Sequence, residues 1–105
     1  MSNNCNVKEA LLEVKRKIAD VESEMEDIEI KQSIIKAQLI KIIWTDASIS
    51  RERLREAELV LRLAADTDYQ VLAGKLRNLK LIRRLASEEE DRLHYQMLRE
   101  DYSGD

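Results

Sequence analysis

Residues 28–44 read IEIKQSIIKAQLIKIIW, and this stretch decides the fold. Seven isoleucines, one leucine and one tryptophan stand here among four charged residues. Apolar residues at this density, recurring at intervals of three and four, are typical of a helix that is packed along its length. The same spacing continues toward the N-terminus, so the stretch is the end of a longer repeat.

The repeat starts at Val7. Alternate steps of four and three residues from Val7 to Ile42 meet an apolar side chain everywhere except at Gln32. This period of 3.5 residues predicts the seam of a left-handed coiled coil in a helix over about 7–44. Such a long helix needs a partner helix, from its own chain or from another. The apolar seam positions are Val7, Leu11, Val14, Ile18, Val21, Met25, Ile28, Ile35, Leu39 and Ile42.

Gln32 is the one polar residue of the seam. A buried polar group there lowers stability but disfavours wrong registers and oligomer states, so Gln32 is a candidate register selector. Alternatively, Gln32 faces a wet or widened part of the core.

A second feature is that the helix becomes apolar on several sides beyond residue 27, which predicts additional covering helices near its end. The off-seam residues are Ile30, Ile34, Ile40, Ile43 and Trp44.

A turn is expected at about 45–49, because Thr45, Asp46 and Ser48 all favour helix N-termini. After it, one helix or two helices are expected over about 50–101. Thr67 followed by Gln70 matches a capping box, which places a bend or short break near 66–67. The seam of this second half is predicted at Leu54, Ala57, Leu61, Ala65, Tyr69 (or Asp68), Leu72, Leu76, Leu79, Ile82, Ala86, Leu93 and Met97.

Gly74 lies inside this helical pattern, where glycine is about 1 kcal/mol less favourable than alanine. We interpret Gly74, beside Ala73, as a point of close approach between helices.

Composition agrees with long helices. The chain has 105 residues, no proline and two glycines, with 44% hydrophobic and 37% charged residues, which indicates one folded helical domain rather than a disordered chain. Residues 1–6 are expected to be a flexible tail and residues 7–102 a single coiled-coil domain. The predicted class is all-α: a long helical coiled-coil hairpin or a three-helix bundle, forming a dimer or higher oligomer.

The single cysteine, Cys5, excludes a disulfide within the chain and fits a reducing compartment. The polar N-terminus resembles no secretory signal, and no apolar run approaches the roughly 20 residues that span a bilayer. We therefore expect a cytoplasmic protein, with a nuclear one as the alternative, and no membrane partner.

The charges form blocks. Residues 20–29 carry six acids and no base, whereas residues 75–84 carry five bases and no acid. A simple hairpin would not bring these blocks together, so we expect a bend near 66 or pairing between chains. Within the basic block, Arg77, Lys80 and Arg84 lie on one helical face. This face is either a phosphate-contacting stripe for nucleic acid or a solvated, salt-bridging edge, and the net charge of −3 favours the latter.

The sequence offers little sign of catalysis. His94, the sole histidine, has no metal-ligand partners at regular spacing, and no phosphate-binding glycine loop or nucleophile–base pair is present. We therefore expect no catalytic residue, metal or cofactor.

One enzyme family is worth comparison. Ser48-Ile49-Ser50-Arg51-Glu52 is similar to the Asp-x-x-Arg-Glu pattern that begins the second helix of the all-helical chorismate mutases. That resemblance would imply a small all-helical enzyme with inward arginines and a lysine on the first helix. The seam here holds apolar residues and Gln32 instead, so it offers no cationic pocket for a dianionic substrate.

The function expected from the sequence is a non-enzymatic protein–protein interaction module: a scaffold, an adaptor or a regulatory binding protein. It would self-associate or bind a helical protein partner through the first seam and the apolar region around Trp44. A dimeric nucleic-acid regulator is the alternative. The predicted interface residues are Leu11, Ile18, Met25, Ile28, Gln32, Ile35, Leu39, Ile42 and Trp44.

Overall fold

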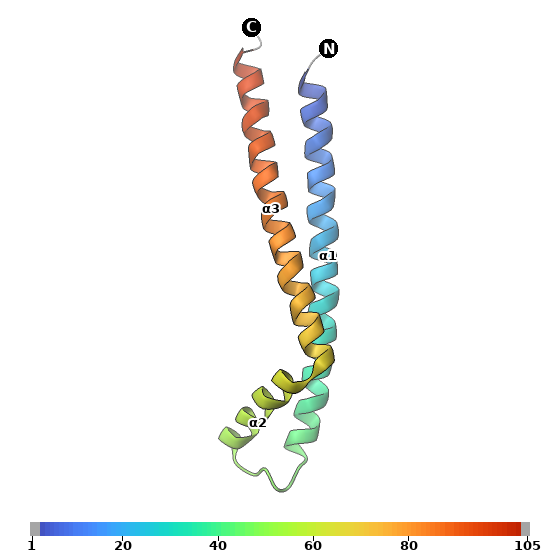
Figure 1. Ribbon diagram of the computed structural model, residues 1–105, viewed down its shortest axis with the longest axis vertical. Coiled ribbons are helices and arrows are strands. Elements are labelled where there is room, and N and C mark those ends of the chain that lie inside the picture. The colour runs from blue at the N-terminus through green and yellow to red at the C-terminus, as the bar shows by residue number, and fades with distance from the viewer. Residues whose placement is uncertain (1–2, 104–105) are drawn as a thin grey trace. The chain divides into compact units, whose positions relative to one another are not determined.

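The computed structural model describes residues 3–103, and the side chains of residues 6–101 within them (Figure 1). The described residues form three α-helices and no strand, which confirms the predicted all-α class. The helices are α1 (Asn3–Trp44), α2 (Glu52–Ala65) and α3 (Thr67–Ser103).

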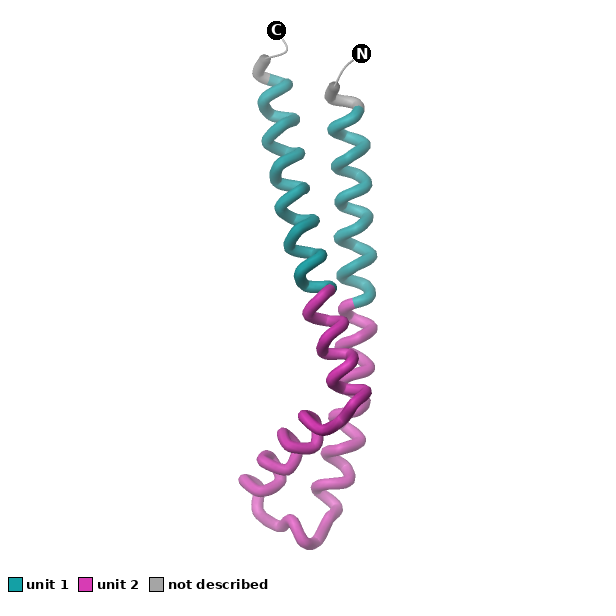
Figure 2. Tube along the Cα trace, viewed as in Figure 1, with its two compact units in different colours: residues 1–24, 79–105 teal, residues 25–78 magenta. Residues whose placement is uncertain are grey.

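The chain divides into two compact units (Figure 2). Unit 1 comprises residues 1–24 and 79–105, and unit 2 comprises residues 25–78. The first turns of α1 and the last turns of α3 therefore belong to unit 1. The remainder of these two helices, together with all of α2, belongs to unit 2.

Unit 1 is an antiparallel pair of helices. Val7 and Leu11 of α1 are buried with Leu93 of α3 in one cluster. Val21, further along α1, and Ala86, earlier on α3, are also buried. Because the seam positions of α1 meet seam positions of α3 from the same chain, the partner expected for the first helix is supplied within the molecule over this unit. Three partly buried residues pack against the cluster: Ala10, Val14 and Met97.

Unit 2 has a smaller interior. Met25, Ile28 and Ile43 are its buried hydrophobic residues, and Ile43 is fully enclosed with 0% of its surface exposed. All three belong to α1. In contrast, α2 contains no buried residue at all. The covering of the apolar end of α1 by additional helices, which the sequence led us to expect, is therefore incomplete within a single chain.

The end of the first seam differs from the prediction by one residue. The 3.5-residue repeat places Ile42 in the core, but Ile42 is 54% exposed and its neighbour Ile43 is buried. A straight α-helix drifts by about 20° per heptad from a 3.5-residue repeat. Over the five heptads from Val7 the drift reaches about 100°, the rotation between successive residues, so the buried position moves from Ile42 to Ile43.

The helix boundaries also differ slightly. α1 begins at Asn3, so residues 3–6, expected to be a flexible tail, are helical, whereas residues 1 and 2 of that tail lie outside the described residues. Once a helix exists, each added residue gains a backbone hydrogen bond at little entropic cost, which explains the extension. The link between α1 and α2 covers residues 45–51 rather than 45–49.

The break in the second half is present where the sequence placed it. α2 ends at Ala65, and α3 begins at Thr67, so Asp66 alone separates the two helices. α3 then runs without interruption through Ser87 to Ser103.

Gly74 does not mark a close approach between helices, contrary to the interpretation made from the sequence. A Cβ atom built on Gly74 would meet only the Arg77 side chain, at an ordinary contact distance of 3.7 Å from Nη2. The surrounding space on this part of α3 is open, so helix packing does not require glycine at this position.

We therefore predict that Gly74→Ala stabilises the protein. The expected gain is about 1 kcal/mol, because alanine loses less backbone entropy in a helix and meets no obstruction here. Urea unfolding followed by circular dichroism measures it, with Ala73→Gly as the matched control that should lose a similar amount. A lower midpoint for Gly74→Ala would contradict the open environment of this residue.

Candidate interaction surface

The predicted interface residues of α1 fall into three groups. Leu11, Met25 and Ile28 are buried within the chain, and Ile42 and Trp44 are exposed. The others are half-buried: Ile18, Gln32, Ile35 and Leu39. A side chain that is already buried presents little area to another protein, so the surface available for association must be sought among the exposed residues.

Gln32 lies at the predicted seam position but is only half-buried. Its side chain makes no hydrogen bond to another described residue, and its partial exposure leaves the amide accessible to water. Its role in selecting a register stays a prediction.

α2 is attached to the end of α1 mainly through Arg55. The Arg55 Nε donates a hydrogen bond to the Ile49 carbonyl at 2.9 Å, and its guanidinium carbon lies 5.8 Å from the centre of the Trp44 ring. A cation held over an indole face at this distance is attracted by the ring quadrupole. Two half-buried leucines, Leu59 and Leu63, follow on the same face of α2. These contacts fix which side of α2 faces the chain.

In this orientation the predicted seam of α2 faces outward instead of toward the rest of the chain. Leu54, Ala57, Leu61 and Ala65 were expected to face inward, but all four are exposed. The prediction ran one repeat from Leu54 through residue 66 to Met97, and the break at Asp66 resets the helical phase. α2 has leucines on two faces, and the face aligned with Arg55 is the one turned toward α1.

The junction between α2 and α3 is built by Asp66 and Gln70. The Asp66 Oδ1 accepts a hydrogen bond from the Tyr69 backbone N–H at 2.8 Å, so Asp66 caps the start of α3. The Gln70 Nε2 donates to the Leu63 carbonyl at 3.0 Å and so caps the end of α2. The predicted capping box is therefore corrected by one residue: Asp66, not Thr67, supplies the cap, because Asp66 directly precedes the first turn of α3 and its carboxylate reaches the Tyr69 N–H.

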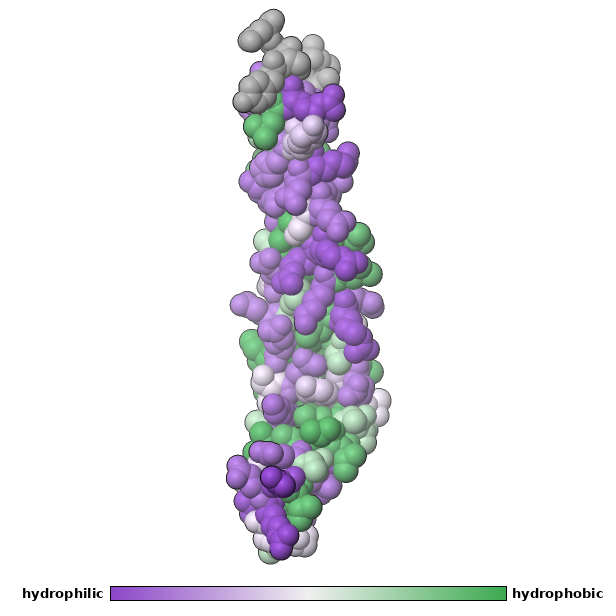
Figure 3. Space-filling view, turned by 90° about the vertical axis from the view of Figure 1, so that its left-hand side faces the viewer, coloured by the Kyte–Doolittle hydropathy of each residue, from purple (hydrophilic) through white to green (hydrophobic). Residues whose placement is uncertain are grey.

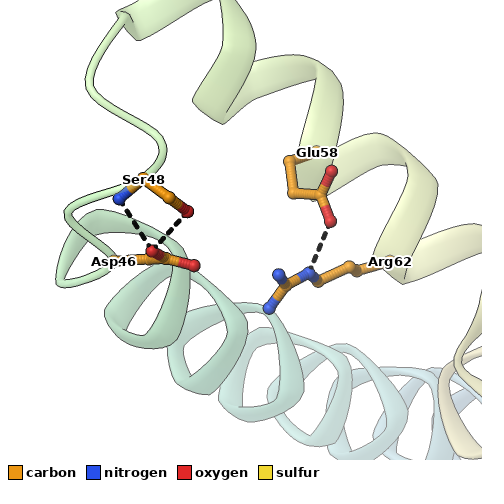
Figure 4. A network of polar contacts seen from close by, with 4 residues as sticks. All are labelled: Asp46, Ser48, Glu58 and Arg62. Atoms are coloured by element: carbon orange, nitrogen blue, oxygen red, sulfur yellow. Dashed lines mark hydrogen bonds and ion pairs between the residues drawn. The ribbon is translucent and has the colours of Figure 1, made fainter.

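The link before α2 is ordered by Asp46 (Figure 4). Its Oδ1 accepts hydrogen bonds from the Ser48 hydroxyl at 2.7 Å and from the Ser48 backbone N–H at 2.9 Å. These bonds, with a smaller contribution from the positive charge of Arg62, hold the pKa of the Asp46 carboxyl below its usual value. Arg62 is itself paired with Glu58, the Nε lying 2.8 Å from Oε1.

An apolar hollow lies on the exposed side of α1 in unit 2. Ile30, Ile34 and Ala37, spaced by four and three residues, form its apolar part. Glu26 and Glu29 lie at its N-terminal end, and Ser33 completes the lining. Ile30 and Ile34 are both exposed. The sequence identified these isoleucines as additional to the seam, and the structure leaves them uncovered.

The charge blocks come to the same level in unit 1. Leu11 packs with Leu93, and if this antiparallel register continues along the helices, Asp20 is level with Arg84 and Glu24 with Lys80. The break at Asp66 is present where the sequence placed one of its two alternatives, a bend near 66, and pairing of these charges between chains stays a prediction. None of these four side chains makes an ion pair shorter than 4.0 Å with another described residue, so the attraction is long-range and screened.

The predicted basic face is accessible. Arg77, Lys80 and Arg84 are all exposed, and the part of the chain that the structure describes provides no ion-pair partner for them. Arg77 belongs to unit 2, and the other two belong to unit 1.

Neither a metal-binding cluster nor a membrane-spanning helix is found in the part of the chain that the structure describes. Among the described side chains, no group of three or more His, Cys, Asp or Glu is arranged to hold a metal ion. The described helices include none with the length and apolar character needed to cross a bilayer. Comparison with protein-family models, curated proteins and solved structures finds no match to this chain.

The cap at Asp66 yields a stability prediction. Asp66→Ala should lower the free energy of unfolding by about 1 kcal/mol, because the Tyr69 N–H loses its acceptor. Thr67→Ala is the matched control and should change stability by less than half as much. Urea unfolding of both variants compares them, and a larger loss for Thr67→Ala would restore the capping box predicted from the sequence.

Ser48→Ala should raise the pKa of Asp46, because the hydroxyl hydrogen bond is the largest cause of its depression. A depressed carboxyl pKa contributes stability above the unfolded-state pKa, and this contribution is lost as the pH falls through the folded-state pKa. The link should therefore loosen in acid. Carbon-detected NMR titration of the Asp46 carboxyl tests this, and an unchanged pKa in the variant would refute the assigned cause.

Proposed function

We propose that this chain is a non-enzymatic protein–protein interaction module that self-associates through the apolar surface of unit 2. One observation carries the proposal: unit 2 buries three hydrophobic residues but leaves eight large ones exposed. Large exposed apolar patches are uncommon on soluble monomers and mark association sites. The exposed residues are Ile30, Ile34, Ile42, Trp44, Leu54, Val60, Leu61 and Val71.

The distribution of these residues supports association rather than chance exposure. Seven of the eight lie on α1 and α2, where they include spaced pairs: Ile30 and Ile34 on α1, and Leu54 and Leu61 on α2. Helical stripes of this kind are how one helix packs against another. Figure 3 shows hydrophobic side chains gathered on one face of the molecule at the level of α2. A helical partner, in particular a second copy, supplies stripes of matching character.

Self-association predicts a mass that depends on concentration. Light scattering on a sizing column should give more than 12.3 kDa at high concentration and approach that value on dilution. Leu61→Glu should reduce the mass at high concentration to that of one chain, because a charge would be placed in the contact.

The matched control is Leu12→Glu. Leu12 is as exposed as Leu61, at 64% against 65%, but it belongs to unit 1. It should leave the mass unchanged. A monomeric wild type at every concentration, or equal effects of the two variants, would contradict self-association through unit 2.

A second candidate is binding of nucleic acid by Arg77, Lys80 and Arg84. Their exposure and their spacing on α3 favour it, whereas Asp20 and Glu24 at the level of Lys80 and Arg84 oppose it. Titration with labelled DNA and RNA at two salt concentrations distinguishes the candidates, because phosphate contacts weaken steeply with salt. Absence of binding at low salt would exclude this alternative.

A further inference from the structure

The outer face of α2 is an apolar stripe with a regular pattern. Leu54, Ala57, Leu61 and Ala64 recur at intervals of three, four and three residues and are all exposed. The two leucines are 55% and 65% exposed, and Val60, at the edge of the stripe, is 66% exposed. Leucine and alanine alternate along this stripe, so large and small side chains alternate on the surface.

α2 also lacks enough packing of its own. It is 14 residues long and contains no buried residue. Helices of about this length are marginal in water and are stabilised in proteins mainly by packing of an apolar face. Its N-cap residue, Arg51, makes no side-chain capping bond. A cover on the outer stripe would supply the missing stabilisation.

The two ends of α2 differ in net charge. At the N-terminal end Arg51 and Arg53 outnumber Glu52, and at the C-terminal end the two acids that follow the helix, Asp66 and Asp68, outnumber Arg62. Arg51, Arg53, Asp66 and Asp68 make no ion pair with another described residue. The helix dipole adds to this polarity, since its N-terminal end is positive and its C-terminal end is negative. A helix with such ends is complementary to itself when one copy is reversed.

We propose that α2 packs antiparallel against α2 of a second copy of this chain, about a two-fold axis near the middle of the helix. In this register Leu54 faces Ala64 of the second copy, and Ala57 faces Leu61 of the second copy. Every layer then pairs a large residue with a small one, which allows close packing without a void. The same register sets Arg53 beside the acids that follow the second copy's α2.

This inference rests on the proposed function and adds its occupant and geometry. A two-fold contact uses the same patch on both chains and therefore closes as a dimer. A helix of 14 residues is only about 21 Å long, so a contact confined to α2 is smaller than a standard stable interface. The dimer should therefore dissociate reversibly on dilution.

Disulfide trapping tests the register. In a Cys5→Ser background, chains carrying Ala57→Cys are mixed with differently tagged chains carrying Leu61→Cys and oxidised under mild conditions. We expect a disulfide between the two kinds of chain as the main product. Chains carrying Ala57→Cys alone should cross-link weakly, because the two cysteines would be offset by about 6 Å along the helix axis.

Charge exchange gives an independent readout that leaves the apolar stripe intact. Arg53→Glu alone and Asp68→Lys alone should each weaken self-association by about fivefold, while a mixture of the two variants should associate as well as the wild type. The reason is that antiparallel packing places each introduced charge beside its opposite. Arg77→Glu, outside α2, should have no effect.

The outcomes separate the two proposals. Cross-linking between positions 57 and 61, with restoration in the charge-exchanged mixture, supports the antiparallel α2 contact. Association that depends on Leu61 but shows neither effect overturns this geometry and leaves self-association through unit 2 standing. A protein that stays monomeric at all concentrations overturns both.

Discussion

Two helices packed side by side bury only one narrow stripe of each, and this limit governs the molecule. In unit 1 one stripe of each helix is matched, because Val7 and Leu11 of α1 meet Leu93 of α3. In unit 2 the same α1 helix carries apolar residues on more than one side. Its own chain covers the side containing Ile28 and Ile43, and the geometry leaves no third helix to cover Ile30 and Ile34.

The position of α2 follows from polar contacts more than from burial. Arg55 ties its first turn to Trp44 and to the Ile49 carbonyl, while Gln70 and Asp66 hold its end at the junction. These contacts hold α2 in one orientation, but no residue of α2 is buried by the rest of the chain. The outer stripe of α2 therefore stays exposed in a single chain. A contact between two copies through this stripe requires that exposure.

Much of the fold could be predicted from the spacing of apolar residues. The seam from Val7 to Leu39, the end of α1 at Trp44 and the break at Asp66 all follow from local patterns, because helix periodicity and capping residues act over a few positions. The exchange of Ile42 for Ile43 follows from the difference between 3.5 and 3.6 residues per turn, which becomes visible only after several heptads.

The orientation of α2 could not be predicted in this way. Leu54, Ala57 and Leu61 form as regular a stripe as Leu59 and Leu63 offer on the other side, so periodicity alone does not choose between them. The choice depends on Arg55, Trp44 and Ile49, which come together only after the link has turned. For the same reason the sequence pointed to residues such as Leu11 and Met25 for association, whereas the exposed surface includes Val60, which no repeat singled out.

The single residue between α2 and α3 has a consequence for the topology of the chain. Without the Asp66 cap, α2 and α3 would favour one continuous helix, since no proline or glycine separates them. A straight helix through this position would carry Arg55 away from Trp44 and free the end of α1. Domain swapping requires such an opened chain, so the Asp66 cap and the Gln70 hydrogen bond to the Leu63 carbonyl, which keep α2 and α3 apart, both oppose it.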